Sequence, residues 1–411
     1  MMKLRRTMWP VVLAGAWVAI GIGWAAPDVA SSASEVNPPA ETLTVSLEYE
    51  EVGYSLMNSS VTVAEQPTAF KREPQTGKGK VRRGRFSFQF PTESPLPFLW
   101  DWTEGKLYLD LNRNEDLTDD AEGVFSSSIR ASGSSSYRHG MFPNVHLSMQ
   151  TEAGRQPWLV DLNLSDYRGR LNVYAGVRSL WAGKAVLAGR EWQVGVIDNP
   201  RVKRGVAGVG HLVLRPWENR GDRFGVSDGS LDAFPFSSKL FIQTRCYQVD
   251  CAFLAEGDKL RCQLKFQEQP AELAELKLSG DFIQRVHLRD GPCLVVLDAP
   301  AETVRVPVGR YGDHQVRLGK GDAVAHPERS DRDVRKPLVV AKDKPAALTA
   351  GGPLTNSVTV TRRGKHLVFN YRLLGAGGEP YQLGTTDYSK PPRFAVYQGD
   401  KKIASGKFEF G

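Results

Sequence analysis

Apolar and polar residues alternate along most of the chain. Leu43, Val45 and Leu47 are separated by polar residues. The same period of two recurs in later segments, at 86–90, 107–111, 171–173, 212–214, 358–360, 367–371, 394–396 and 408–410. An apolar residue at every second position places one face of a strand against a core. The pattern therefore predicts a protein that is almost all β, with Leu273 and Leu276 giving the clearest helix-like spacing.

Turn-rich and charged stretches divide this pattern into segments. A chain of 411 residues is too long for one ordinary core, so we expect two or three domains. Residues 42–239 are interpreted as one large β domain, and residues 240–320 as a small domain that contains all four cysteines. The polar residues 321–336 are interpreted as a linker. Residues 337–411 have short strands and Gly-rich turns at the spacing of an immunoglobulin-like sandwich.

The end of the small domain has a distinct pattern. An apolar strand is stopped by Pro307 and Gly309, and the next strand begins on Tyr311. This segment of about fifteen residues resembles the strand-turn-strand close of transthyretin-like and other small Greek-key modules. The resemblance implies a small Greek-key fold for residues 240–320. The expected fold class is thus mostly β, built from several β-sandwich domains.

The N-terminus has the order of a targeting segment. Basic residues at positions 3–6 precede an apolar run over 11–24, and the small residues 25–26 follow. This order predicts a signal peptide over residues 1–26, with an uncleaved membrane anchor as the alternative. Residues 27–41, rich in Pro, Ser and Ala, are interpreted as a linker. We expect a secreted, periplasmic or cell-envelope protein with no membrane span after the leader is removed.

Charge and composition exclude one class of partner. The net charge is +7, and it falls to 7 − 3 = +4 without Lys3, Arg5 and Arg6, because residues 1–26 contain no acid. The densest basic run, Lys78 to Arg85, is interpreted as a solvated loop. Nucleic-acid binding requires a clustered basic stripe, so no nucleic-acid partner is expected.

Oxygen-bearing side chains are concentrated after the strand-like run at 106–109. Calcium takes six to eight oxygen ligands, and a tight loop offers them from alternate residues. The expected ligands are Asp110, Asn112, Asn114, Asp116, Thr118, Asp119 and Asp120, with Asp116 contributing its carbonyl and Thr118 binding directly or through water. Leu117 is expected to hold the loop on the core. The alternative is an acidic surface turn without a metal.

These residues resemble the calcium loop of EF-hands and of dockerin-type modules over about twelve positions. The segment departs from the pattern at position six, where Glu115 replaces Gly, and at position twelve, where Ala121 replaces the bidentate acid. It also follows a strand rather than a helix. The resemblance implies an isolated EF-hand-like loop on a β scaffold, with a weak affinity of about 10⁻⁴–10⁻³ M and with Asp119, Asp120 or Glu122 completing the shell.

The four cysteines of an exported chain permit two disulfides. A hairpin around the turn 255–258 pairs Cys251 with Cys262, where Cβ atoms lie close enough to bridge. Cys246 and Cys293 are then left as the second pair. Four buried, reduced thiols are the alternative.

Catalytic motifs are weak in this sequence. Ser227 lies in a G-x-S-x-G sequence, but the polar run before it and the Pro after it do not fit a strand-to-helix elbow. The seven histidines have neither H-x-x-x-H nor H-x-H spacing, so no local zinc site is predicted. No catalytic residue is predicted.

Two function classes remain. The first is a secreted or envelope-associated, non-catalytic calcium-binding structural or binding protein, whose partner is a cell-envelope protein or a polysaccharide. Most tryptophans are expected to pack in the core, but a sugar-stacking platform is considered at Trp100, Trp102, Trp181 and Trp217. The second is an extracellular hydrolase that acts on a polymer such as a polysaccharide, with a site assembled from distant loops.

Overall fold

The computed structural model describes residues 41–66, 68–76, 81–88, 95–128, 137–151, 153–198, 210–226, 230–257, 259–320, 323–327, 336–383 and 392–408. Within these ranges every element is a β-strand, apart from the 3-10 turns η1 (Ala121–Gly123) and η2 (Trp217–Asn219). None of the described elements is a helix of the length and apolarity needed to cross a membrane. The mostly-β prediction is confirmed. The predicted signal peptide and linker lie outside the described residues, apart from Glu41.

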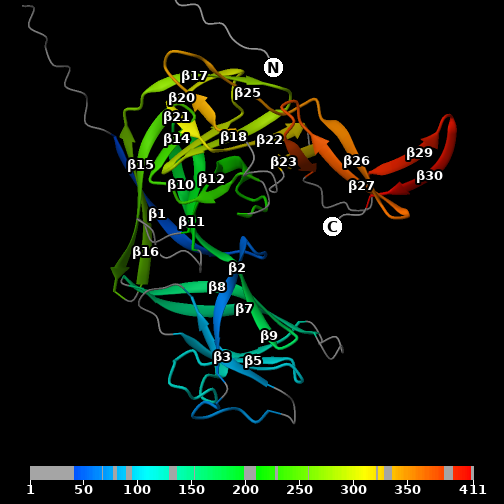
Figure 1. Ribbon diagram of the computed structural model, residues 1–411. Coiled ribbons are helices and arrows are strands. Elements are labelled where there is room, and N and C mark those ends of the chain that lie inside the picture. Colours follow the sequence, from blue (N-terminus) through cyan, green and yellow to red (C-terminus); the bar gives the residue numbers. More distant parts are fainter. Residues whose placement is uncertain are drawn as a thin grey trace, which may run out of the picture. The chain divides into compact units, whose positions relative to one another are not determined.

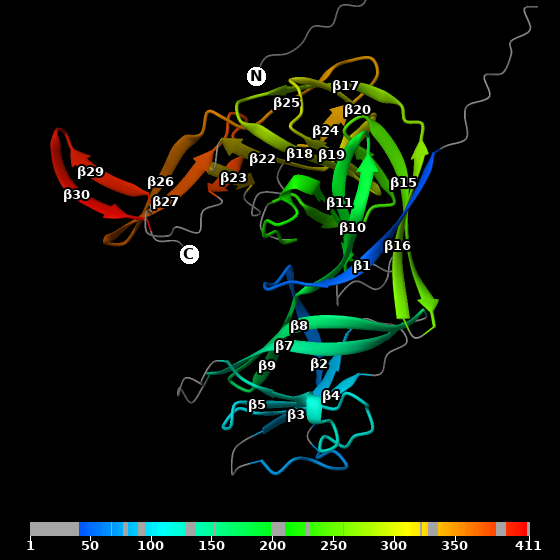
Figure 2. The same cartoon turned by 180° about the vertical axis from the view of Figure 1, so that it is seen from behind.

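One antiparallel sheet carries the acidic loop (Figures 1 and 2). Its described strands run in the order β6 (Val124–Ser126), β5 (Lys106–Leu109), β4 (Leu96–Asp101), β3 (Val81–Ser87), β2 (Met57–Glu65), β9 (Arg170–Val177), β8 (Gly154–Tyr167) and β7 (Tyr137–Thr151). Alternate residues of these strands bury apolar side chains, among them Phe98, Trp100 and Val160, in a shared core. Residues 81–85 of the basic run, interpreted from the sequence as a solvated loop, belong to β3.

A second sheet contains most of the remaining described strands. Their order is β13 (Ala233–Pro235), β12 (His211–Pro216), β11 (Arg190–Ile197), β10 (Ser179–Leu187), β1 (Thr42–Glu51), β16 (Lys259–Gln269), β15 (Arg245–Glu256), β14 (Lys239–Ile242), β19 (Cys293–Asp298), β18 (Ile283–Asp290), β22 (Asp313–Lys320), β23 (Ala323–Pro327), β28 (Pro380–Leu383), β27 (His366–Leu374) and β26 (Thr355–Arg363). The pair β14–β19 is parallel, and the other pairs are antiparallel.

Short sheets account for the other described strands. They are β20 (Thr303–Pro307), β17 (Leu273–Ser279) and β25 (Ala346–Thr349) in one sheet, β21 (Gly309–Tyr311) with β24 (Leu338–Val340), and β29 (Arg393–Gln398) with β30 (Lys401–Lys407). The helix-like spacing of Leu273 and Leu276 was misleading, because both residues lie on β17. Two leucines three apart fit a helix turn, but their backbone hydrogen bonds are completed by β20 and β25.

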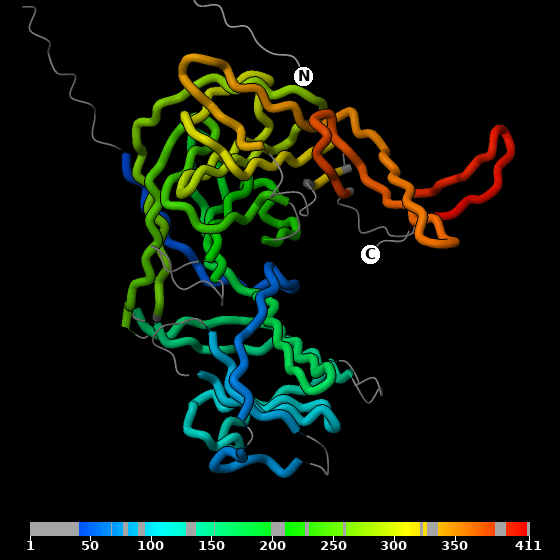
Figure 3. Tube along the Cα trace, in the orientation of Figure 1, coloured from blue at the N-terminus to red at the C-terminus, as the bar shows by residue number. Residues whose placement is uncertain are grey.

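The predicted boundary between residues 239 and 240 does not separate two cores. β1 pairs along its first half with β16 and along its second half with β10, a path that can be followed in Figure 3. One apolar cluster accordingly contains Val45, Trp181 and Leu240 together with Leu294. Alternation along a strand shows which face is buried, but it does not identify the partner strand, so the sequence could not place this junction.

The C-terminal boundaries also differ from the prediction. Residues 323–327 of the expected linker form β23, which pairs with β22 and β28. β24 and β25 pair with β21 and β17, and their side chains join the core of the preceding segment. The described part of 337–411 is therefore not one separate sandwich. An immunoglobulin-like fold for it is not confirmed.

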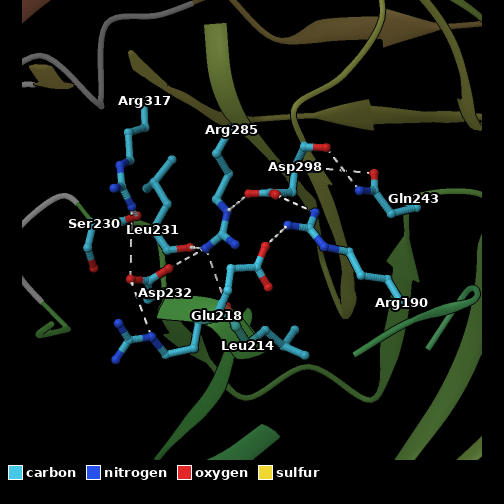
Figure 4. A network of polar contacts seen from close by, with 11 residues as sticks. Arg190, Leu214, Glu218, Ser230, Leu231, Asp232, Gln243, Arg285, Asp298 and Arg317 are labelled. Atoms are coloured by element: carbon cyan, nitrogen blue, oxygen red, sulfur yellow. Dashed lines mark hydrogen bonds and ion pairs between the residues drawn. The ribbon is translucent and has the colours of Figure 1, made fainter. Parts of the chain in front are cut away.

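A buried ionic network joins segments on the two sides of residue 240 (Figure 4). The guanidinium of Arg285 on β18 is 1% exposed and contacts the carboxylates of Asp232 and Asp298. It also donates a hydrogen bond of 2.8 Å to the carbonyl of Leu231. The wider network includes Arg190, Gln243, Glu218, Arg215 and Arg317. Because isolated charges are costly to bury, each group depends on its partners.

We expect Asp232→Ala to lower the free energy of unfolding by about 3–5 kcal/mol, because it leaves the Arg285 guanidinium buried with one counter-ion fewer. Urea unfolding measures the change. The double variant with Arg285→Met is expected to lose less than the sum of the two single variants. As a control, Glu191→Ala breaks the exposed pair with Lys184 and should cost less than about 1 kcal/mol. Equal losses for the buried and exposed pairs would contradict this account.

Candidate metal centre

The acidic loop begins where β5 leaves its sheet. Asp110 follows Leu109 directly, its N–H donates to the Pro97 carbonyl at 3.0 Å, and its side chain is fully buried. Leu117 is 2% exposed and packs with Phe70, Leu99 and Tyr108. The expectation that Leu117 holds the loop on the core is confirmed.

Alternate side-chain oxygens hold the first half of the loop. The carboxylate of Asp110 accepts hydrogen bonds from the N–H of Asn114 at 3.1 Å and from the N–H of Glu115 at 2.8 Å. Asn112 Oδ1 accepts from the N–H of Asn114 at 3.0 Å, and Asn114 Oδ1 accepts from the N–H of Asp116 at 2.7 Å. The backbone is thus wound around the oxygens of positions one, three and five.

The sharp turn at position six forms without glycine. Glu115 has φ 69° and Arg113 has φ 62°, both in the left-handed region that favours glycine. External contacts hold Glu115 there: its carboxylate lies 2.7 Å from Arg85, and its carbonyl accepts from the N–H of Arg72 at 3.3 Å. The substitution at position six therefore preserves the sharp turn, at a conformational cost.

Asp119 and Asp120 close the loop from its far end. Asp119 accepts hydrogen bonds from the side-chain amides of Asn112 at 3.2 Å and Asn114 at 2.7 Å. Asp120 accepts from the N–H of Leu111 at 2.9 Å. Burial raises the pKa of Asp120, and although backbone N–H groups oppose this change, the charges of Asp110 and Asp119 raise it further. Three carboxylates are therefore near enough to repel one another.

The predicted ligands at positions seven and nine are arranged differently. The Thr118 hydroxyl donates to the Asp116 carboxylate at 2.5 Å, and Arg72 lies 3.3 Å from the same carboxylate. These side chains satisfy one another on the outside of the loop. Asp110, Asp119 and Asp120, by contrast, form no ion pair with a described Lys or Arg. The structure therefore divides the predicted set into an outer pair, Asp116 and Thr118, and an inner group. The inner group consists of Asp110, Asn112, Asn114, Asp119 and Asp120.

The inner group fits a cation only if carboxylate and amide oxygens bind the ion together. In the part of the chain that the structure describes, no three His, Cys, Asp or Glu side chains are arranged together as a metal site. The oxygens of Asn112 and Asn114, and a backbone carbonyl, would have to complete the shell with the carboxylates. Such oxygen ligands suit calcium. Cation binding would require the amide contacts to Asp119 to be exchanged for bonds to the ion.

The segment Phe70–Glu73, called the strap below, covers the loop and was not predicted from the sequence. The N–H of Leu117 donates to the Arg72 carbonyl at 3.1 Å, and Phe70 packs on the Leu117 side chain. Glu73 anchors the strap with two hydrogen bonds of 2.6 Å from Arg83 and one of 2.9 Å from the Phe70 N–H. The only signal was Phe70 itself, an apolar residue in a polar stretch.

The predicted cysteine pairs are not joined. All four cysteines are free, and the Sγ atoms of Cys251 and Cys262 are 3.7 Å apart. The hairpin register places Cys262 opposite Phe253, because the turn is closed by Glu256 and Lys259, one residue later than the expected pair 255 and 258. Both thiols still share a face as diagonal neighbours. Cys246 and Cys293 lie on the two strands that flank β14, opposite Phe241 and Lys239. They are separated by two strand spacings, about 9.5 Å, across the sheet and by two residues along it, which is beyond the reach of a disulfide.

Other predicted positions do not form a site. Trp100 and Trp181 are buried in the core. Trp102 and Trp217 are half-buried, with Arg138 over the ring of Trp102 and Lys184 and Arg220 over that of Trp217. The structure therefore does not support the tryptophan platform. Ser227 lies outside the described residues.

We expect Leu117→Ala to lower the free energy of unfolding by about 2–5 kcal/mol, because it opens a cavity between the loop and the strap. Chemical denaturation measures the loss. Val339→Ala, at a side chain that is 58% exposed, is the matched control and should be nearly neutral. A neutral Leu117→Ala variant would show that the loop is not held by this contact.

Glu73 is expected to make stability depend on acid pH. Burial alone would raise its pKa, but hydrogen bonds from Arg83 and the Phe70 N–H outweigh burial and lower the pKa below 4.5. The stabilisation by the Glu73 carboxylate is therefore complete above pH 4.5, and it is lost as the pH falls through the lowered pKa of the folded state. Thermal unfolding between pH 7 and 3 should show Glu73→Gln less stable at pH 7, with the difference closing in acid. The exposed Glu104→Gln should show no such convergence.

Comparisons with family models, with curated proteins and with solved structures give no match to the chain.

Proposed function

We propose that the loop from Asp110 to Asp120 binds calcium, and that the protein is a secreted or envelope-associated calcium-stabilised structural or binding protein. The observation that carries the proposal is the inner group of carboxylates. Asp110, Asp119 and Asp120 are drawn together at the two ends of one turn, without a described cationic partner. A divalent cation relieves this repulsion directly.

The proposed ligands come from both ends of the turn. Asp110 supplies the buried carboxylate, and the side-chain oxygens of Asn112 and Asn114 add uncharged ligands. Asp119 and Asp120 replace the acid that is missing at position twelve. We assign the Asp116 carbonyl, rather than its carboxylate, to the shell, since Arg72 and Thr118 already engage the carboxylate.

Calcium binding would join the two ends of the loop and so stabilise the sheet beside it. The ends of the turn lie next to β5 and η1, and Gly123 packs so closely on the Leu109 carbonyl that a Cβ there would lie 2.2 Å from its oxygen. An ion held between Asp110 and Asp120 joins these segments. A ligand that binds the folded state alone stabilises it by about 2.7 kcal/mol at a hundredfold excess over Kd.

We expect calcium to raise the melting temperature of the full chain by a few degrees over its value in chelator, because only the folded loop presents the ligands. Differential scanning calorimetry measures the shift. Asp110→Asn should abolish the calcium-dependent part, while Asp400→Asn, on the exposed turn between β29 and β30, should retain it. Identical melting in calcium and in chelator for the wild-type chain would refute the proposal.

The alternative of a polysaccharide hydrolase stays a prediction. Among the residues that the structure describes, no arrangement favours it over binding. The proposed function therefore assigns no catalytic residue.

A further inference from the structure

A cavity of about 420 Å³ lies at the start of β18, on elements other than those of the acidic loop. It is lined by residues from the segment 278–284, by the loop 299–302 and by Gly319 on β22. Its volume falls in the range of small-molecule sites. Both ends of the loop 299–302 are fixed, by a hydrogen bond from the Ala299 N–H to the Gln284 carbonyl at 2.7 Å and by one from the Leu278 N–H to the Glu302 carbonyl at 2.7 Å.

Phe282 holds an exposed ring at this cavity through a strained backbone. Its φ is 66°, in a region that bulky residues rarely occupy, and the residue is 42% exposed. Hydrogen bonds on both sides impose this conformation: the Gly319 N–H donates to the Phe282 carbonyl at 3.0 Å, and Asp281 pairs with Gly352. The Phe282 ring lies against Gly352, where a Cβ would come within 2.8 Å of Cδ2, but a large part of the residue stays open to solvent. Backbone strain at a solvent-exposed aromatic residue is typical of binding sites.

A β-bulge places Gln284 beside this ring. The register between β18 and β22 shifts between Ile283 and Arg285, so Gln284 is the extra residue. Its side chain lies against Gly319, where a Cβ would come within 2.7 Å of Oε1. Within the described residues this Oε1 is buried without a hydrogen-bond partner. Bulges commonly redirect a side chain at a functional site, and Gln284 is among the residues that line the cavity.

The remaining polar groups at the cavity favour a hydroxylated, uncharged ligand. Asp281 and Glu302 line it, both are exposed, and neither forms an ion pair with a described residue. Two carboxylates disfavour an anion and accept hydrogen bonds from hydroxyl groups. Lys320 lies 4.5 Å from the centre of the Phe282 ring, on which it makes a cation–π contact.

We propose that this cavity binds a neutral saccharide. The apolar C–H face of a sugar ring stacks on Phe282, and its hydroxyl groups donate to Asp281 and Glu302 and form hydrogen bonds with the amide of Gln284. The aromatic ring contacts the apolar face of a pyranose, and the amide and carboxylates around the ring bind its hydroxyl groups. The proposal goes beyond calcium binding and rests on different residues.

Isothermal titration calorimetry of the full chain with hexamers of β-1,4-linked glucose, xylose and mannose tests this. We expect at least one hexamer to bind and Phe282→Ala to raise its Kd by about tenfold. Gln284→Leu should also weaken binding, because it removes the amide but keeps the size. Tyr397→Ala, at an exposed aromatic residue on β29, is the matched control and should bind as wild type does.

Phe282→Gly separates binding from folding. Glycine adopts φ 66° without strain, so this variant should lose binding and keep or raise the melting temperature. Saccharide binding should also be the same in calcium and in chelator, which distinguishes it from the calcium proposal. No binding of any neutral hexamer, unchanged binding in Phe282→Ala, or equal binding of a galacturonate hexamer would each overturn the inference.

Discussion

The buried guanidinium of Arg285 is the constraint on which the central part of the fold depends. Its charge is compensated only when Asp232, directly before β13, and Asp298, at the end of β19, both reach it. A guanidinium offers its donors in one plane, so it fixes the direction of each partner as well as its distance. Arg285 also follows the bulge at Gln284 directly. The network thereby fixes the end of β18 at which the proposed saccharide cavity lies.

The acidic loop was the most predictable feature, because its chemistry is local. Asp110, Asn112 and Asn114 could be read as inward-facing from their spacing alone, and their hydrogen bonds to nearby N–H groups agree with that reading. The contact of Leu117 with the core was predicted from the same spacing. The separation of Asp116 and Thr118 from the inner group could not be predicted, since it depends on Arg72, more than forty residues earlier in the chain.

Strand content was predictable, but strand partners were not. Alternation identified strands such as β1 and β5, whereas the pairing of β1 with β16 and of β25 with β17 depends on contacts between distant segments. The cavity at Phe282 could not be predicted from the sequence for a related reason. A positive φ at phenylalanine has no sequence signal, because hydrogen bonds from β22 and from Gly352 impose it.

The pairing of β1 also sets the order in which the chain can fold. Thr42 is the register partner of Gln267, so the first described strand cannot complete its edge until the polypeptide is long enough to include β16. Until then, its row of alternating apolar residues is open to incorrect strand pairing. Contacts this distant in sequence slow folding, because a large loop must close before they form. A chain of this topology gains from being kept unfolded until its synthesis has passed the β15–β16 hairpin.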